Sequence, residues 1–166
     1  MKKYLFNWIL WPDFSMIPSV HDPVLRWEPF QPGATIEIDG KTITGYPVNH
    51  IPGAVAYWVH DDNAGFLFSG DMCSTPDLWS TLLAETRLRK VIVDCSFPNA
   101  EAELAARSMH FCPQSLLADI QGMPDSIEFL IYHLKPGQED LIMDELRMAG
   151  GNRLFRTLRD GDVFIF

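Results

Sequence analysis

The order of predicted elements in this 166-residue chain indicates an α/β (α+β) protein in which helices cover a mixed sheet. Asp39-Gly40 lies between two alternating segments, which is the strongest short-range signal for a β-hairpin. Farther along, short apolar runs alternate with helical patterns, as they do in βα units. A chain of this length can bury a core of its own, so we expect residues 1–166 to form a single domain.

The N-terminal half is predicted to contain a loop-rich segment and two hairpins. Residues 1–33 are rich in proline and show little periodicity, which is typical of an irregular segment that covers another part of a domain. Alternating residues then predict strands over 35–38 and 41–48, with the Asp39-Gly40 turn between them. A second strand pair is predicted over 54–60 and 65–69, around the polar residues 61–64.

The C-terminal half is predicted to alternate helices and strands. A helix over 76–88 opens with Pro76 after the capping residues Ser74-Thr75, and a short β-branched strand follows over 90–94. Helices over 101–107 and 113–121 precede a strand over 127–132, and a helix over 138–149 ends at Gly150-Gly151. A closing hairpin over 153–158 and 162–166 is predicted around Asp160-Gly161.

Charge and composition exclude several classes of protein. The formal net charge is -9, from 13 basic and 22 acidic residues, and this disfavours binding to duplex nucleic acid. A small anionic substrate held by metal ions remains compatible with that charge. Three cysteines without paired spacing argue against a disulfide framework. No apolar run approaches the length of a membrane span, so we expect no membrane partner and a cytoplasmic location.

Side chains that can bind metals follow four of the predicted strands. Val48-Asn49-His50 ends one alternating segment, Ser69-Gly70-Asp71 ends another, and Asp94 and His133 end two apolar runs. Open sheets place their ligands at the carboxyl ends of strands, and borderline metals bind histidine nitrogen and carboxylate oxygen. Taken singly, each of these residues is more often a cap or an ordinary loop residue. Their joint occurrence predicts one shared site.

A family resemblance rests on motifs that occur in a fixed order. These are Asn49-His50, Ser69-Gly70-Asp71, the run from Asp94 to Asn99, Ser108-Met109-His110 with Pro113, and His133-Leu134-Lys135-Pro136. In this order they resemble the second half of metallo-β-lactamase-fold phosphodiesterases, and in particular the class II 3',5'-cyclic nucleotide phosphodiesterases. The resemblance implies a metallo-β-lactamase-like αββα sandwich, of which this chain contains the second half together with the loop-rich N-terminal segment.

The resemblance also implies roles for individual residues. His50 would bind the first metal, Asp71 would bridge two metals, and His133 would complete the second. The implied ions are two Zn²⁺, or Mn²⁺ or Fe²⁺, which hold a hydroxide that attacks the phosphorus of a cyclic nucleotide. His110 is similar to a histidine that related enzymes direct at the scissile phosphate, with Asp94 as its orienting acid. An ordinary helix-flanking role for His110 is equally compatible with the sequence.

The His-x-His-x-Asp-His motif of that family is absent from the 166 residues. Without it, each metal keeps two protein ligands, whereas catalytic zinc normally has three. We therefore expect weak activity and weak metal binding from this chain alone, and pairing with a chain that supplies the missing half, or homo-oligomerisation. Two alternatives stay open: an inactive relative that serves as a binding or assembly module, and a single ion bound by His50, Asp71 and His133. Met72, and the run Ser108-Met109-His110 in place of a more usual glycine before the histidine, also depart from the family pattern.

Overall fold

The computed structural model describes residues 1–165, which divide into two compact units, Met1–Phe30 and the described residues from Gln31 onward. Among the described residues, none of the helices combines the length and the apolar character needed to cross a bilayer. The larger unit contains all seven strands and all the helices of the described chain. The expectation that residues 1–166 form a single domain stays a prediction.

The first unit is irregular, as its proline content predicts. Its order comes from two isolated bridges, Phe6 with Trp11 and Pro18 with Pro23, and from packing of the Phe6 ring against Phe14 and Trp27. Trp8 and Trp11 remain 58% and 57% exposed. The covering role expected for residues 1–33 therefore stays a prediction.

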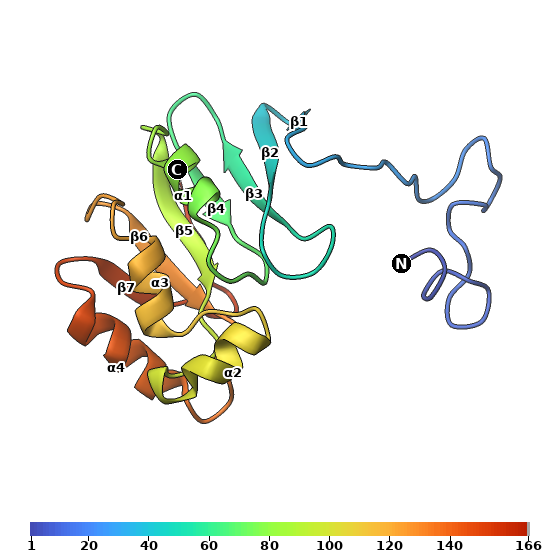
Figure 1. Cartoon of the computed structure of the whole chain (residues 1–166). Coiled ribbons are helices and arrows are strands. Elements are labelled where there is room, and N and C mark those ends of the chain that lie inside the picture. The colour runs from blue at the N-terminus through green and yellow to red at the C-terminus, as the bar shows by residue number, and fades with distance from the viewer. Residues whose placement is uncertain (166) are drawn as a thin grey trace. The chain divides into compact units, whose positions relative to one another are not determined.

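The larger unit is built on one seven-stranded sheet in which spatial order follows chain order (Figure 1). Strands β1 to β4 are antiparallel neighbours, and β4 to β7 are parallel neighbours. The β1–β2 hairpin turns at Asp39 and Gly40, which both have positive φ angles, as a two-residue hairpin turn requires. The strands are β1 (Thr35–Ile38), β2 (Lys41–Pro47), β3 (Val55–His60), β4 (Gly65–Phe68), β5 (Leu88–Asp94), β6 (Glu128–Tyr132) and β7 (Leu154–Thr157).

The helices bury one main core against a single face of this sheet. Trp79 and Leu82 of α1, Leu116 of α3, and Ile142 and Leu146 of α4 contribute to it. From the sheet they meet the buried residues Ala56, Trp58, Leu67, Val91, Val93, Phe129 and Ile131. The helices are α1 (Pro76–Leu82), the 3₁₀ helix η1 (Asn99–Glu101), α2 (Ala102–Arg107), α3 (Pro113–Asp119) and α4 (Glu139–Ala149).

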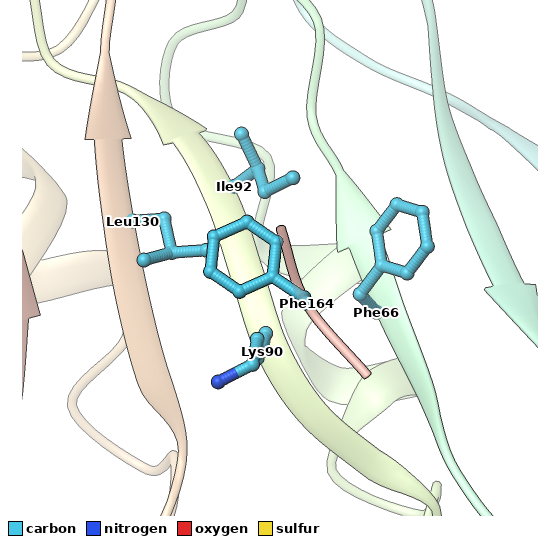
Figure 2. A pocket seen from close by; sticks show the side chains of 5 residues that line it. All are labelled: Phe66, Lys90, Ile92, Leu130 and Phe164. Carbon is cyan, nitrogen blue, oxygen red and sulfur yellow. The ribbon is translucent and has the colours of Figure 1, made fainter. Parts of the chain in front are cut away.

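The opposite face of the sheet carries a hollow that the C-terminal segment enters. Phe66 of β4, Lys90 and Ile92 of β5, and Leu130 of β6 line it, and Phe164 lies over them (Figure 2). The ammonium of Lys90 lies 5.3 Å from the centre of the Phe164 ring, within cation–π range. The hollow is therefore mainly apolar and is covered in part by the C-terminal segment.

The predicted strands up to residue 158 are present, and two predicted elements need correction. The first helix ends at Leu82 and not at Leu88, because Leu88 begins β5 and pairs with Gly65. Leu88 continues the leucine spacing of the helix, but the sheet uses it as a buried strand residue. Residue Gly65 must be glycine, because a Cβ there would lie 2.5 Å from the carbonyl oxygen of Val59.

The predicted closing hairpin is wrong. Strand β7 pairs with β6 in the parallel direction, and residues 162–165 form no strand; Phe166 lies outside the described residues. The turn itself is present, since Gly161 has a φ of 88° and the amide of Asp162 donates to the carbonyl of Arg159. The chain after the turn crosses the sheet face, where burial of Phe164 replaces strand pairing.

Glu128 connects the three parallel strands β5, β6 and β7 through ion pairs on the face of the sheet opposite the helices. Its carboxylate accepts from Lys90 of β5 and from Arg156 of β7, at 3.2 Å in the second case. The Lys90 ammonium, followed by Arg156, holds the pKa of Glu128 below its ordinary value of 4.5. A depressed carboxyl pKa stabilises the fold above that ordinary value, and the stabilisation disappears as the pH falls through the folded-state pKa.

We therefore expect Glu128→Gln to lower the free energy of unfolding by about 0.5–1 kcal/mol at pH 7, the range of a half-exposed ion-pair network. The difference from the unmodified chain should shrink as the pH falls below about 4.5. Urea unfolding at several pH values measures it, and Glu103→Gln on the exposed side of α2 is the matched loss of charge. A pH-independent difference would contradict this account of the ion pairs.

Candidate functional site

Sheet topology brings the predicted site residues to one edge. Strands β4, β5 and β6 are parallel, and β2 runs in the same direction because two antiparallel pairings separate it from β4. His50 follows β2, Asp71 follows β4, Asp94 is the last residue of β5, and His133 follows β6 directly. Four carboxyl ends of strands therefore deliver one polar side chain each to the same edge.

The five side chains form one cluster. One ligand atom each from His50, Asp71 and His110 lie within 4.8 Å of one another, and the same holds for Asp94, His110 and His133. The His110 ring centre lies 4.9 Å from that of His50 and 4.8 Å from that of His133. His133 Nδ1 lies 3.3 Å from Asp71 Oδ1, which links the two groups. The structure thus brings together all the residues predicted for the site.

The backbone around the cluster adopts uncommon conformations. Gly70 has a φ of 59°, which turns the chain after β4 so that Asp71 reaches the edge of the sheet. Met109 and His133 have φ angles of 60° and 61°, which cost a non-glycine residue roughly 1 kcal/mol or more. Strain of this kind persists where the surrounding structure compensates for it, and it is concentrated at functional sites.

Asp94 is the fully buried carboxylate of the cluster. Its Oδ2 accepts from His110 Nδ1 at 2.5 Å and from the amide of Met72 at 3.2 Å, and its Oδ1 accepts from Ser96 Oγ at 2.7 Å. Three donors satisfy the charge, which would otherwise be very costly to bury. Asp71, by contrast, has a side chain that is 44% exposed and is accessible from solvent. The two carboxylates therefore have different tasks: one orients neighbours, and the other faces the site.

The hydrogen bonds determine which nitrogen is protonated in two of the histidine rings. His50 Nδ1 lies 3.0 Å from the carbonyl oxygen of Met109, which can only accept, so this nitrogen carries the hydrogen. His110 Nδ1 faces the Asp94 carboxylate and is likewise the donor. In a neutral ring the lone pair then lies on Nε2, the nitrogen that remains to bind a metal or to exchange a proton.

Three further residues contribute to this edge and were missed from the sequence. Ser96 lies between Asp94 and His133, and Met109 holds His50 through its carbonyl. The buried Tyr132 hydroxyl lies close to Ser69 and Asp71 but makes no hydrogen bond of good geometry within the described chain, and burial, with a smaller contribution from nearby carboxylates, raises its pKa. Ser96 could have been found, because it follows the predicted Asp94 by two residues. The Met109 backbone contact has no sequence signal.

The donor set fits a borderline divalent metal. Imidazole nitrogens from three histidines and the accessible carboxylate of Asp71 are the ligand types that zinc and iron prefer. His133 has a side chain that is 33% exposed and His110 one that is 10% exposed, so both rings are partly open to solvent. The Met72 side chain is not a candidate ligand, because it is fully buried in the core behind the site.

A pocket of about 330 Å³ adjoins His110. Small and uncharged residues form most of its wall, including Cys73, Ala102, Ala106 and Gln114. The pKa of the Cys73 thiol is raised by burial and by the carboxylate of Asp119, so a protonated thiol faces this space at neutral pH. A substrate that reaches His110 therefore meets a mainly apolar surface beside it.

Comparison with known proteins places this geometry in a wider context. No family model matches the chain. The chain is 25% identical over 196 aligned positions to a protein of Yersinia pestis described as "Probable 3',5'-cyclic-nucleotide phosphodiesterase". The alignment covers 98% of this chain and 56% of that protein, so the chain spans about half the length of the relative that it matches.

Solved structures agree on the fold. The metallo-β-lactamase fold protein YhfI of Bacillus subtilis superposes with a TM-score of 0.66 at 17% identity, over 81% of this chain and 54% of YhfI. Zinc-bound PqqB of Methylobacterium extorquens gives a TM-score of 0.56 at 14% identity, over 82% of this chain and 51% of PqqB. The chain therefore has part of the metallo-β-lactamase fold and, in its sequence, resembles a 3',5'-cyclic-nucleotide phosphodiesterase.

Proposed function

We propose that this chain is the C-terminal part of a metal-dependent phosphodiesterase that hydrolyses a small phosphodiester, with a 3',5'-cyclic nucleotide as the substrate. The observation that carries the proposal is the convergence of His50, Asp71, Asp94, His110 and His133 on one edge of the sheet. Similarity to a protein described as a cyclic-nucleotide phosphodiesterase supports the same reaction. It supports the substrate class only by analogy, which is why the substrate is part of the proposal.

The metal ligands that we propose are His50, Asp71 and His133. Divalent ions, Zn²⁺ or else Mn²⁺ or Fe²⁺, would supply Lewis acidity toward the phosphate and a hydroxide at neutral pH. The protein would hold these ligands through contacts already present, such as the bond between His50 Nδ1 and the Met109 carbonyl. Asp71 is the exposed carboxylate of the cluster, and it approaches both histidines: it lies within 4.8 Å of a ring nitrogen of His50 and 3.3 Å from His133 Nδ1.

His110 is the residue that we propose to move a proton. Its Nδ1 is fixed on the buried Asp94 carboxylate, which orients the ring. Nε2 is then the nitrogen that can give a proton to the departing oxygen of the phosphodiester. The adjoining apolar pocket offers space for the organic part of a substrate.

With only His50, Asp71 and His133, each ion would have two protein ligands, one histidine and the shared Asp71 carboxylate. That is too few for a stable pair of catalytic zinc ions. We propose that the remaining ligands come from a His-x-His-x-Asp-His segment outside these 166 residues, in the same protein or in a partner chain. The sheet face opposite the helices, where Phe68 is 37% exposed and Tyr57 36% exposed, is a suitable surface for packing such a segment. The segment that packs on this surface, and the oligomeric state of the protein, are part of this proposal.

Hydrolysis assays test the proposal directly. We expect cyclic AMP hydrolysis with Zn²⁺ or Mn²⁺ to be weak for this chain alone and to rise when a chain carrying the missing motif is added. His110→Ala should lower kcat by about 10²- to 10⁴-fold in the active combination, the usual contribution of a positioned acid. His21→Ala, at an exposed histidine of the first unit, is the matched control and should change kcat by less than twofold. Lack of hydrolysis with and without the added chain would count against the proposal.

Substitutions of Asp94 and Asp71 should have different effects on the free energy of unfolding. Asp94→Asn replaces a buried acceptor of three hydrogen bonds by an amide that can pair only in part, so we expect a loss of about 1–3 kcal/mol in the free energy of unfolding. Asp71→Asn, at the exposed carboxylate, should stay within about 0.5 kcal/mol of the unmodified chain. Urea unfolding of both variants without added metal measures this. Equal losses would show that Asp94 is not the organising group.

A second candidate function is a catalytically inactive binding or assembly module. The apolar sheet face, with Phe68 37% exposed and Tyr57 36% exposed, is the observation that favours it. Under this function the chain should form a stable oligomer and bind no zinc. Analytical ultracentrifugation with elemental analysis distinguishes the two, since a monomer that carries stoichiometric zinc would exclude the assembly module.

A further inference from the structure

Ser96 connects the two halves of the histidine cluster in a way that the proposed roles do not use. The residue is fully buried, and its hydroxyl lies 2.7 Å from Asp94 Oδ1 and 3.1 Å from His133 Nδ1. The Asp94 carboxylate also accepts from His110 Nδ1. One chain of hydrogen bonds therefore joins His110, Asp94, Ser96 and His133.

The number of available hydrogens determines which group donates and which accepts in each of these hydrogen bonds. An ionised carboxylate can only accept, so the single hydrogen of the Ser96 hydroxyl is donated to Asp94. The hydroxyl then faces His133 with a lone pair, and Nδ1 of that ring must be the donor. The other groups near Nδ1 agree, because Asp71 Oδ1 at 3.3 Å and Asp94 Oδ1 at 3.8 Å are also acceptors.

We propose that Ser96 is a positioning residue that holds His133 in the Nδ1–H tautomer and thereby presents the lone pair of Nε2 to the metal. The inference rests on the proposed function, in which His133 is a ligand. It adds that one buried carboxylate orients two histidines with different tasks, His110 directly and His133 through a serine hydroxyl. Such an outer partner fixes the tautomer and the orientation of a metal-binding ring.

Asp71 cannot perform this task as well as Ser96. Its carboxylate is the exposed ligand of the cluster, and a bound cation would attract it away from His133 Nδ1. Ser96 is held in place by its backbone, because its amide donates to the carbonyl of Phe111 at 2.9 Å and its carbonyl accepts from the amide of Lys135 at 3.3 Å. The hydroxyl therefore stays beside His133 whether or not a metal is bound.

Nitrogen-15 NMR of the histidine rings in the metal-free chain tests the inference without any activity assay. The unmodified chain should show His133 protonated at Nδ1, with the signal assigned by its loss in His133→Gln. Ser96→Ala should shift His133 toward the Nε2–H tautomer, and Ser96→Thr, which keeps a hydroxyl, should retain Nδ1–H. Ser115→Ala is the matched control: it removes a serine that caps α3 and should leave the His133 tautomer unchanged.

Zinc competition measures the consequence for binding. Ser96→Ala should weaken Zn²⁺ binding by about 10- to 100-fold, and Ser96→Thr should restore part of that affinity. A His133 ring protonated at Nε2 in the unmodified chain, or a tautomer that Ser96→Ala does not change, would overturn the inference. Failure of the proposed function is distinguishable, because it appears as absent hydrolysis while the NMR result for Ser96 is read independently.

Discussion

The buried carboxylate of Asp94 is the constraint on which the arrangement of the site depends. It lies at the end of β5, between the ends of β4 and β6, and it is shielded from solvent completely. A charge in that place must collect donors, and the donors it collects are the Met72 amide, the Ser96 hydroxyl and the His110 ring. Because each donor belongs to a different loop, the requirement to satisfy one charge fixes the loops relative to one another.

The sheet makes this possible through its change from antiparallel to parallel pairing. Up to β4 the chain forms hairpins, and from β4 onward each strand is followed by a connection that returns to the opposite end of the sheet. Parallel strands collect their carboxyl ends at one edge, which is where open sheets bind their ligands. The helices cover one face, and Phe164 lies over part of the other (Figure 2). That second face carries the exposed aromatic side chains of Phe68 and Tyr57 as well as the ion pairs of Glu128.

Much of this could be predicted from the sequence, and what could not has identifiable physical reasons. Periodicity and the Asp39-Gly40 turn predict the strands, and position at strand ends predicts His50, Asp71, Asp94 and His133. The predicted hairpin over 153–158 and 162–166 was wrong because alternation after the Asp160-Gly161 turn resembles a strand, whereas in the structure this segment lies over the sheet face with Phe164 in the hollow. The position of Ser96 two residues after Asp94 could have indicated the local hydrogen bond to that carboxylate, but its contact with His133 spans 37 positions and no local pattern reports such a contact.

The central claim is that His50, Asp71 and His133 form a cation site at the carboxyl edge of the sheet, held by the network around Asp94. Anomalous X-ray diffraction at the zinc absorption edge, from crystals of the chain grown with Zn²⁺, tests it most directly. The account predicts anomalous peaks beside Asp71, with Nε2 of His50 directed toward one zinc ion and Nε2 of His133 toward the other. A well-ordered structure with zinc bound elsewhere, or with the three side chains turned away from one another, would contradict it.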